Sequence, residues 1–156
     1  MLKLHKANYM HLMLAGLHLA KSDREEMDRI EAGRDPVDVL TASSGDPTIR
    51  AITDHRGNVM AVGGSEMGTI WFVHTTHAES LSKSGKRVML SLLRGHLKAL
   101  LSQVADHKVA FVNAVSVANR KHIRLLKALG ADFLPGPINH NGHAFLPFIF
   151  KGANHV

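Results

Sequence analysis

VAFVNAVSVANRKHIRLLKALGADF, residues Val109 to Phe133, is the most informative stretch of this sequence. It opens with an almost wholly apolar run to Val117, which is typical of a strand buried on both faces. Asn119 can then cap a helix through its side chain, and Gly130 can end that helix. The inner face of the helix is expected at Leu125 together with Ile123, Leu126 and Leu129. The stretch therefore predicts a buried strand followed by an amphipathic helix.

Three strands and a long helix are expected upstream of this unit. Ile49 to Thr53 and Val59 to Val62 alternate apolar and polar residues around Gly57, which predicts a hairpin. Thr69 to Val73 is rich in aromatic and β-branched residues and predicts the next strand. The connection between these strands is expected at Gly63, Gly64 and Gly68. From Ser82 to Asp106 the apolar residues recur every three or four positions, which predicts a helix.

Both ends of the chain add further elements. Leu2 to Lys6 predicts a strand, and Asn8 can cap a helix from Tyr9 to about Lys21. Two more helices are expected, from Asp23 to Ala32 and from Asp35 to Leu40. The last strands form an expected hairpin around residues 140–143, and prolines place them toward an edge or at bulges: Pro135, Pro137 and Pro147.

Composition limits the classes of protein to consider. The chain has 156 residues, 45% of them hydrophobic, and no cysteine, which excludes disulfides and cysteine nucleophiles. No stretch approaches the roughly 18 apolar residues of a membrane span, so no membrane association is expected. The net charge of +6 favours anionic partners. We expect residues 1–156 to form a single domain.

The order of these elements predicts an α/β (α+β) fold, with a mixed central sheet of about six to seven strands and helices on both faces. This order resembles the GNAT superfamily of N-acetyltransferases. In that family a strand is followed by Asn at the start of a helix that closes in Gly-Phe, and the run Asn119 to Phe133 is similar, although two residues separate Gly130 from Phe133. The resemblance implies one GNAT-like domain.

The C-terminal half, from Gly63 onward, also resembles a small GNAT-like internal virion protein of short-tailed phages. The similarity rests on Trp71-Phe72-Val73, on Ser82 and Gly85-Lys86, and on the residues around Asn113, His122 and Arg124. It implies a phage origin and a location in the host cytoplasm or the virion interior.

The GNAT resemblance implies an acetyl-CoA or CoA site between two splayed strands, with the diphosphate at the start of the following helix. The implied contact residues are Phe72, Val73, Ser80, Lys83, Ser84, Gly85, Lys86, Arg87 and Asn119. Only Gly85 of the family's loop pattern is kept, while Lys83, Lys86 and Arg87 supply charge for a diphosphate.

Catalytic residues depart further from the family. Many members carry a Tyr acid on the helix after the fifth strand, and the matching position here is Leu126. A general base is expected near the fourth strand, where His74 would point toward the mouth of the cleft. Direct attack by an amine depends most on orientation and can survive the loss of one acid.

Two functions follow as hypotheses. The first is a phage N-acetyltransferase that binds acetyl-CoA and acts on an amine of a protein or small molecule. The second is a catalytically silent GNAT scaffold that acts as an internal virion component or binds a host protein. The lost loop residues and Leu126 favour the second.

Metal and nucleic-acid sites are disfavoured. The pairs His74-x-x-His77 and His140-x-x-His143 lack a third ligand at a convincing spacing, so no metal is expected. The cations of the helix after Asn119, namely Arg120, Lys121, Arg124 and Lys127, are not interleaved with aromatic residues, which favours a solvated helix face over a nucleic-acid surface. Basic residues could instead meet the 3'-phosphate of CoA.

Overall fold

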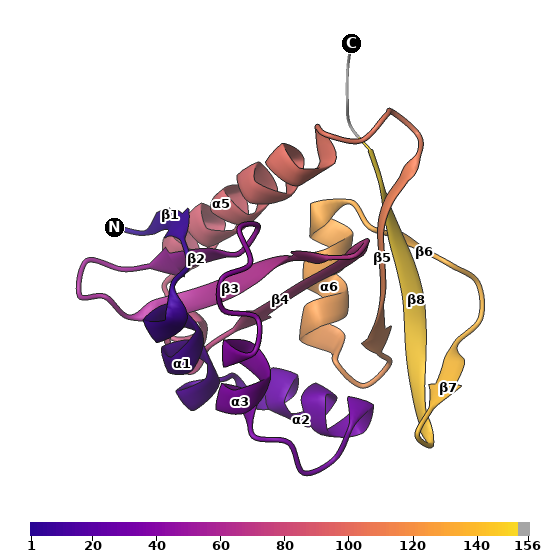
Figure 1. Cartoon of the computed structure of the whole chain (residues 1–156), viewed down its shortest axis with the longest axis horizontal. Coiled ribbons are helices and arrows are strands. Elements are labelled where there is room, and N and C mark those ends of the chain that lie inside the picture. Colours follow the sequence, from indigo (N-terminus) through magenta and orange to yellow (C-terminus); the bar gives the residue numbers. More distant parts are fainter. Residues whose placement is uncertain (153–156) are drawn as a thin grey trace.

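The computed structural model of the chain describes residues 1–152 (Figure 1). The elements, in chain order, are β1 (Lys3–Lys6), α1 (Tyr9–Leu17), α2 (Lys21–Ile30), α3 (Pro36–Thr41), β2 (Arg50–Thr53), β3 (Val59–Glu66), β4 (Thr69–His74), α4 (Thr76–Glu79), α5 (Lys83–Leu101), β5 (Val109–Ser116), α6 (Arg120–Leu129), β6 (Asp132–Phe133), β7 (Ile138–His140) and β8 (His143–Lys151).

Within residues 1–152 the strands form one eight-stranded mixed sheet in the order β1-β2-β3-β4-β5-β8-β6, with β7 paired to β8. Among these named strands the pairing is parallel between β4 and β5 and antiparallel elsewhere. The expected mixed α/β fold is confirmed. The strand count exceeds the expectation because the segment after α6 contributes three strands.

Helices cover both faces of the sheet, as alternation along β4 shows. Ile70 and Phe72 pack with residues of α5 and α6, while Trp71 and Val73 pack toward α1 and α3. The buried core on the α5/α6 face consists of Ile70, Leu97, Leu101, Phe111, Val115, Leu126, Phe148 and Phe150. Burying one such side chain contributes about 1.5–3 kcal/mol before entropy is counted. No helix in this part of the chain is long and apolar enough to cross a membrane.

The first helix is shorter than expected. Asn8 caps it as predicted, accepting from the amide of His11 at 3.0 Å, but it ends at Leu17 rather than at Lys21. The residues after it run beside the end of β4, where the amide of Ala20 donates to the carbonyl of His74 at 3.0 Å. This pairing with a distant strand ends α1 and starts α2, and the local apolar pattern could not reveal it.

The glycines expected in the connection after β3 lie partly inside that strand. Gly63 and Gly64 belong to β3, and only Gly68 takes a positive φ, of 81°, in the turn to β4. A Cβ on Gly63 would stand 2.5 Å from the Cβ of Phe72 on the adjacent strand. Gly63 and Gly64 therefore allow close packing within the sheet, and only Gly68 belongs to the turn.

One burial expectation in the C-terminal half is wrong. β5 is not buried on both faces, because Val109 and Val112 are exposed, whereas Phe111 and Val115 pack into the core on the α5/α6 side. The last strands lie toward an edge of the sheet as expected, with β6 and β7 outermost, but β8, which contains Pro147, pairs with β5 on one side and with β6 and β7 on the other. On one side of β8, Pro147 lies opposite Ala114 of β5. On the other side, it lies between the part of β8 that pairs with β6 and the part that pairs with β7.

Candidate functional site

The parallel strands β4 and β5 separate soon after they meet. Thr69 lies opposite Val112, and beyond this position the strands diverge (Figure 1). The side chain of Asn113 occupies the point of divergence: its Nδ2 donates to the carbonyl of Ile70 at 2.7 Å, and its Oδ1 accepts from the amide of Ala114 at 2.8 Å. Asn113 thereby links the two strand edges through a side chain.

Helix α2 supplies two carboxylates to the same gap. Oδ2 of Asp23 accepts from the backbone amide of His74, at the end of β4, at 2.9 Å. Oε1 of Glu26 accepts from the amide of Ser116, at the end of β5, at 2.8 Å. Backbone donors that a neighbouring strand would satisfy in a continuous sheet are thus satisfied by side chains.

Asp23 also holds two imidazoles. Nδ1 of His74 lies 2.9 Å from Oδ2 of Asp23, and Nδ1 of His122 lies 3.6 Å from Oδ1. The second distance is slightly too long for a hydrogen bond, so this contact is mainly electrostatic. Asn119 donates to the same Oδ1 at 3.3 Å. Asp23 is only 4% exposed, so these partners compensate a buried charge.

The pKa values of the two carboxyl groups are shifted in opposite directions. Burial raises the pKa of Asp23, but the contacts with His122 and His74 outweigh burial and hold that pKa well below its usual value. For Glu26 burial is the dominant effect, and it raises the pKa despite the charge of His122 and the bond from Ser116. Asp23 is therefore the persistent anion of the cluster.

A groove between α5 and α6 reaches this cluster from one face of the sheet. Its volume is about 490 Å³, and His74 forms part of its wall. We call it the α5/α6 groove. Its remaining walls combine apolar side chains with cations and one carboxylate: Ala78, Glu79, Lys86, Met89, Leu90, Lys121, Arg124, Leu125 and Ala128. Nζ of Lys121 lies 3.0 Å from Oε2 of Glu79. An apolar floor with a cationic rim suits an elongated ligand with an anionic end.

A second cavity, of about 300 Å³, reaches the cluster from α2 and α3. We call it the α2/α3 cavity. Asp23, Glu26 and His122 lie in its wall, and so do Trp71 and Val73, which face α1 and α3. Its apolar wall includes Met27, Ile30, Val39, Leu40 and Phe148. The groove and the cavity thus open from opposite sides toward one buried group of charges.

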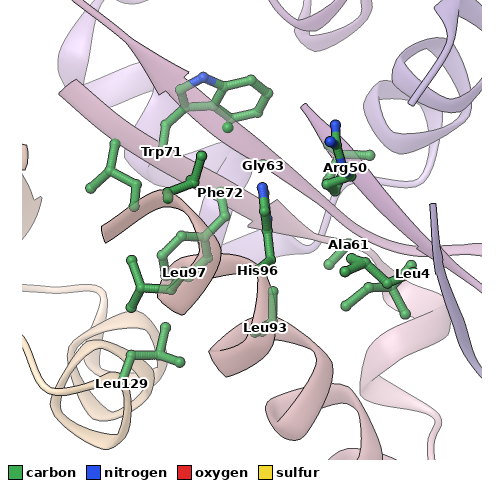
Figure 2. A pocket seen from close by; sticks show the side chains of 15 residues that line it. Leu4, Arg50, Ala61, Gly63, Trp71, Phe72, Leu93, His96, Leu97 and Leu129 are labelled. Atoms are coloured by element: carbon green, nitrogen blue, oxygen red, sulfur yellow. The ribbon is translucent and has the colours of Figure 1, made fainter. Parts of the chain in front are cut away.

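A third hollow, between α5 and the sheet, belongs to the hydrophobic core. Figure 2 shows Phe72, Leu93 and Leu97 around it. Its volume of about 20 Å³ accommodates roughly one water molecule. His96 lies in its wall and places Nε2 3.0 Å from the carbonyl oxygen of Thr48. This hollow is too small for a substrate.

The residues expected to bind CoA are only partly gathered at the groove. Lys86 lies in the wall of the α5/α6 groove. Val73 and Phe72 lie instead in the wall of the α2/α3 cavity, and the ring of Phe72 stacks on that of His122 with the ring centroids 4.7 Å apart. The side chain of Asn119 turns inward, capping α6 through the amide of His122 and donating to Asp23 and Glu26.

The basic loop forms the start of α5. Ser82 caps the helix by accepting from the amide of Gly85 at 3.1 Å, and Oγ of Ser84 lies 3.0 Å from Oγ of Ser82. Oγ of Ser80 instead donates to the carbonyl of Thr76 in α4. Lys83, Ser84 and Arg87 are exposed beside this helix N-terminus and outside the groove wall.

Sequence reasoning missed Asp23, Glu26, His122 and Asn113 as site residues. A signal existed for Asp23: it lies four residues before the buried Met27 on α2, at an inward position of the helix. A charged residue at an inward position requires a partner. Among residues 1–152, no three His, Cys, Asp or Glu side chains are arranged to hold a metal ion.

Comparison with protein families identifies the chain. Residues 50–135, more than half of the 156, match the model described as "Bacteriophage T7, probable scaffold protein Gp13". The chain belongs to this family. The match covers β2 through β6, including the β4–β5 gap and α6. No curated protein matches this Gp13-family chain in sequence.

Solved structures with the GNAT fold resemble the Gp13-family chain along its whole length. Apo-form YjaB from Escherichia coli matches with a TM-score of 0.62 at 12% identity, covering 98% of this chain and 99% of that one. A GNAT-family acetyltransferase from Bacillus cereus gives 0.61 at 10% identity, covering 99% of each chain. The ribosomal-protein-S18-alanine N-acetyltransferase from Escherichia coli gives 0.60 at 14%, covering 99% and 97%. At these identities the likeness shows the fold: this phage-family chain has the GNAT fold.

Proposed function

We propose that this chain binds an acyl-CoA in the α5/α6 groove and transfers the acyl group to an amine in the α2/α3 cavity. The observation that carries the proposal is the meeting of groove and cavity at the cluster of Asp23, His74 and His122. A thioester and an amine that approach from opposite faces can meet in the β4–β5 gap, where orientation alone contributes several kcal/mol.

The groove fits the chemistry of CoA. Lys86 and Arg124 would meet the phosphates, with Lys121 released from Glu79, and Met89, Leu90 and Leu125 would contact the pantetheine arm. The N-terminus of α5, with Lys83, Ser84, Gly85 and Arg87 nearby, adds backbone donors for an anion. When bound, the cofactor supplies an activated acyl thioester.

His74 is the acid–base group of this proposal. Asp23 engages its Nδ1, which leaves Nε2 as the atom that can exchange a proton on the groove side. Because the His74 side chain is only 16% exposed, bulk water has little access to the reacting atoms.

Calorimetry with CoA and acetyl-CoA tests the binding step. We expect Lys86→Ala with Arg124→Ala to weaken binding at least tenfold, because both cations lie in the groove wall. Lys127→Ala is the matched control, since Lys127 is on the same α6 helix but outside the groove wall. No binding of either ligand at millimolar concentration would overturn the proposal.

A second candidate function is a silent scaffold that serves as an internal virion component or binds a host protein. The observation that favours it is that Asp23, Glu26 and Asn113 already satisfy backbone groups along the β4–β5 gap, so a ligand must compete with them. Leu126, fully buried, also stands where the GNAT resemblance implies a Tyr acid. Absence of the protein from purified virions, together with turnover of an amine substrate, would exclude this candidate.

A further inference from the structure

His122 is a buried histidine that the function proposed so far does not use. It is 8% exposed, on the first turn of α6, with its ring stacked on Phe72. Its Nδ1 has no hydrogen-bond partner among the described residues and lies 3.6 Å from Oδ1 of Asp23. A buried imidazole nitrogen without a hydrogen bond is costly for stability, so a role in function would account for His122 at this position.

The position of His122 mirrors that of His74 across one carboxylate. Each imidazole directs Nδ1 toward a different oxygen of Asp23. His74 lies in the wall of the α5/α6 groove, whereas His122 lies in the wall of the α2/α3 cavity. One anion thus holds an acid–base group on the thioester side and another on the amine side.

We propose that His122 is a second catalytic residue, the base that takes the proton of the acceptor amine, while His74 protonates the leaving sulfur. This inference rests on the acyl-transfer function proposed above. It also supplies an acid at a site where the position of the family's Tyr is occupied by Leu126.

The proton and electron balance of the step closes without another reactant. The nitrogen of the neutral amine forms a bond to the acyl carbon and gives one proton to Nε2 of His122. The carbon–sulfur bond breaks, its electron pair leaves with sulfur, and Nε2 of His74 gives that sulfur a proton. His74 begins as imidazolium and His122 as imidazole, and the two exchange these states in the step.

Asp23 is the counter-ion for the imidazolium both before and after this proton exchange in the buried site. The cluster carries one carboxylate and one imidazolium before the transfer and the same charges after it, so no additional charge is buried. Glu26, which bonds to Ser116 and Asn119, is a further titratable group near His122. Burial raises the pKa of Glu26 and so favours its neutral form. Asp23 therefore remains the main counter-ion for either imidazolium.

The test is His122→Gln, assayed by single-turnover acetyl transfer from acetyl-CoA to two small amines. At pH 7 propylamine is an ammonium ion and must lose one proton before it attacks and a second as the N–C bond forms. Trifluoroethylamine is already neutral, and its electron-poor nitrogen is acidic enough in the adduct to give its single proton to water. Loss of a general base costs about 10²–10⁴-fold. We expect a loss of that size with propylamine and a much smaller loss with trifluoroethylamine, while CoA binding measured by calorimetry stays unchanged.

The pH profile gives a second readout. Wild type requires one imidazole protonated and the other neutral, so its rate with propylamine should be bell-shaped, and His122→Gln should alter the limb that reports the base. His77→Gln is the control, because His77 contacts His18 edge-to-face and lies outside the walls of both cavities.

Equal losses with both amines, or an unchanged rate with propylamine, would overturn the role of His122 and leave the transfer function standing. A wild-type chain that binds CoA but acetylates neither amine would overturn the transfer function together with this inference.

Discussion

At the scale of single residues, Asp23 connects the most partners in the site. It accepts hydrogen bonds from the backbone amide of His74 and from the side-chain amide of Asn119, and it contacts two imidazoles. Such a buried anion stabilises the fold only while every partner is in place, because an unpaired charge or donor in a low-dielectric site is costly. The stability of the fold and the acid–base chemistry that we propose therefore depend on the same carboxylate.

Substitution Asp23→Asn should destabilise the chain by about 3 kcal/mol at pH 7, since it removes the counter-ion of a buried pair. The pKa of Asp23 is lowered in the folded state, so its carboxylate contributes stability above the unfolded pKa of about 3.9 and loses this contribution as pH falls toward the folded value. Urea unfolding at pH 7 and pH 3 should show a smaller difference between variant and wild type at pH 3.

The exposed Asp28 on the same helix provides the control, and Asp28→Asn should change stability by less than about 0.5 kcal/mol. A deficit for Asp23→Asn that is equally large at pH 3 would contradict an ionic origin of the effect.

Asn119 shows how far sequence reasoning reaches at this scale. Its capping of α6 could be predicted because the cap is a local bond to His122, three residues away. Its bonds to Asp23 and Glu26 span 96 and 93 residues and depend on how α2 packs against the end of β5. The same limit explains why the position of His122 beside Asp23 could not be read from the helix pattern.

At the scale of elements, the strands and helices with strong periodicity were predictable, and errors occurred where an element ends on a tertiary contact. Helix α1 ends where Ala20 bonds to His74, and β3 continues through Gly63 because Phe72 lies across it. In each case a distant residue overrides a local preference, since packing outweighs intrinsic propensity.

The crossing of α1 and α3 depends on a glycine of this kind. A Cβ on Gly16 would stand 2.7 Å from the Cα of Val37 in α3. Gly16→Ala should therefore force the helices apart and cost about 1–3 kcal/mol, an overpacking penalty that exceeds the gain in helix propensity. Thermal unfolding followed by circular dichroism measures the change.

Gly95, in α5, is the matched helical glycine, because nothing lies within 4 Å of a Cβ built on it. Gly95→Ala should raise stability by about 0.5–1 kcal/mol. If both substitutions stabilise the chain, the close α1–α3 crossing is wrong.

At the scale of the whole molecule, the sheet consists of two halves joined at the β4–β5 gap. The strands β1 to β4 lie on one side and β5, β8, β6 and β7 on the other, and the parallel pairing across the gap lies at Thr69 opposite Val112. Side chains supply the other polar links, above all Asn113, with Asp23 and Glu26 reaching from α2. Cooperativity between the halves should then depend on these side chains.

Asn113→Ala should remove the link between Ile70 and Ala114 and leave their backbone groups without that partner. We expect a loss of about 1–3 kcal/mol and weaker coupling between the halves. The single Trp of the chain, Trp71 on β4, reports one half by fluorescence, while circular dichroism reports the whole. In wild type the two urea transitions should coincide, and in the variant they should separate, since coincidence of probes is the mark of two-state unfolding.

The control is Asn139→Ala, in the exposed β7–β8 hairpin, which should leave the two transitions coincident. Coincident transitions in Asn113→Ala at unchanged stability would mean that packing alone joins the halves, and that a ligand entering the gap has no side-chain brace to displace.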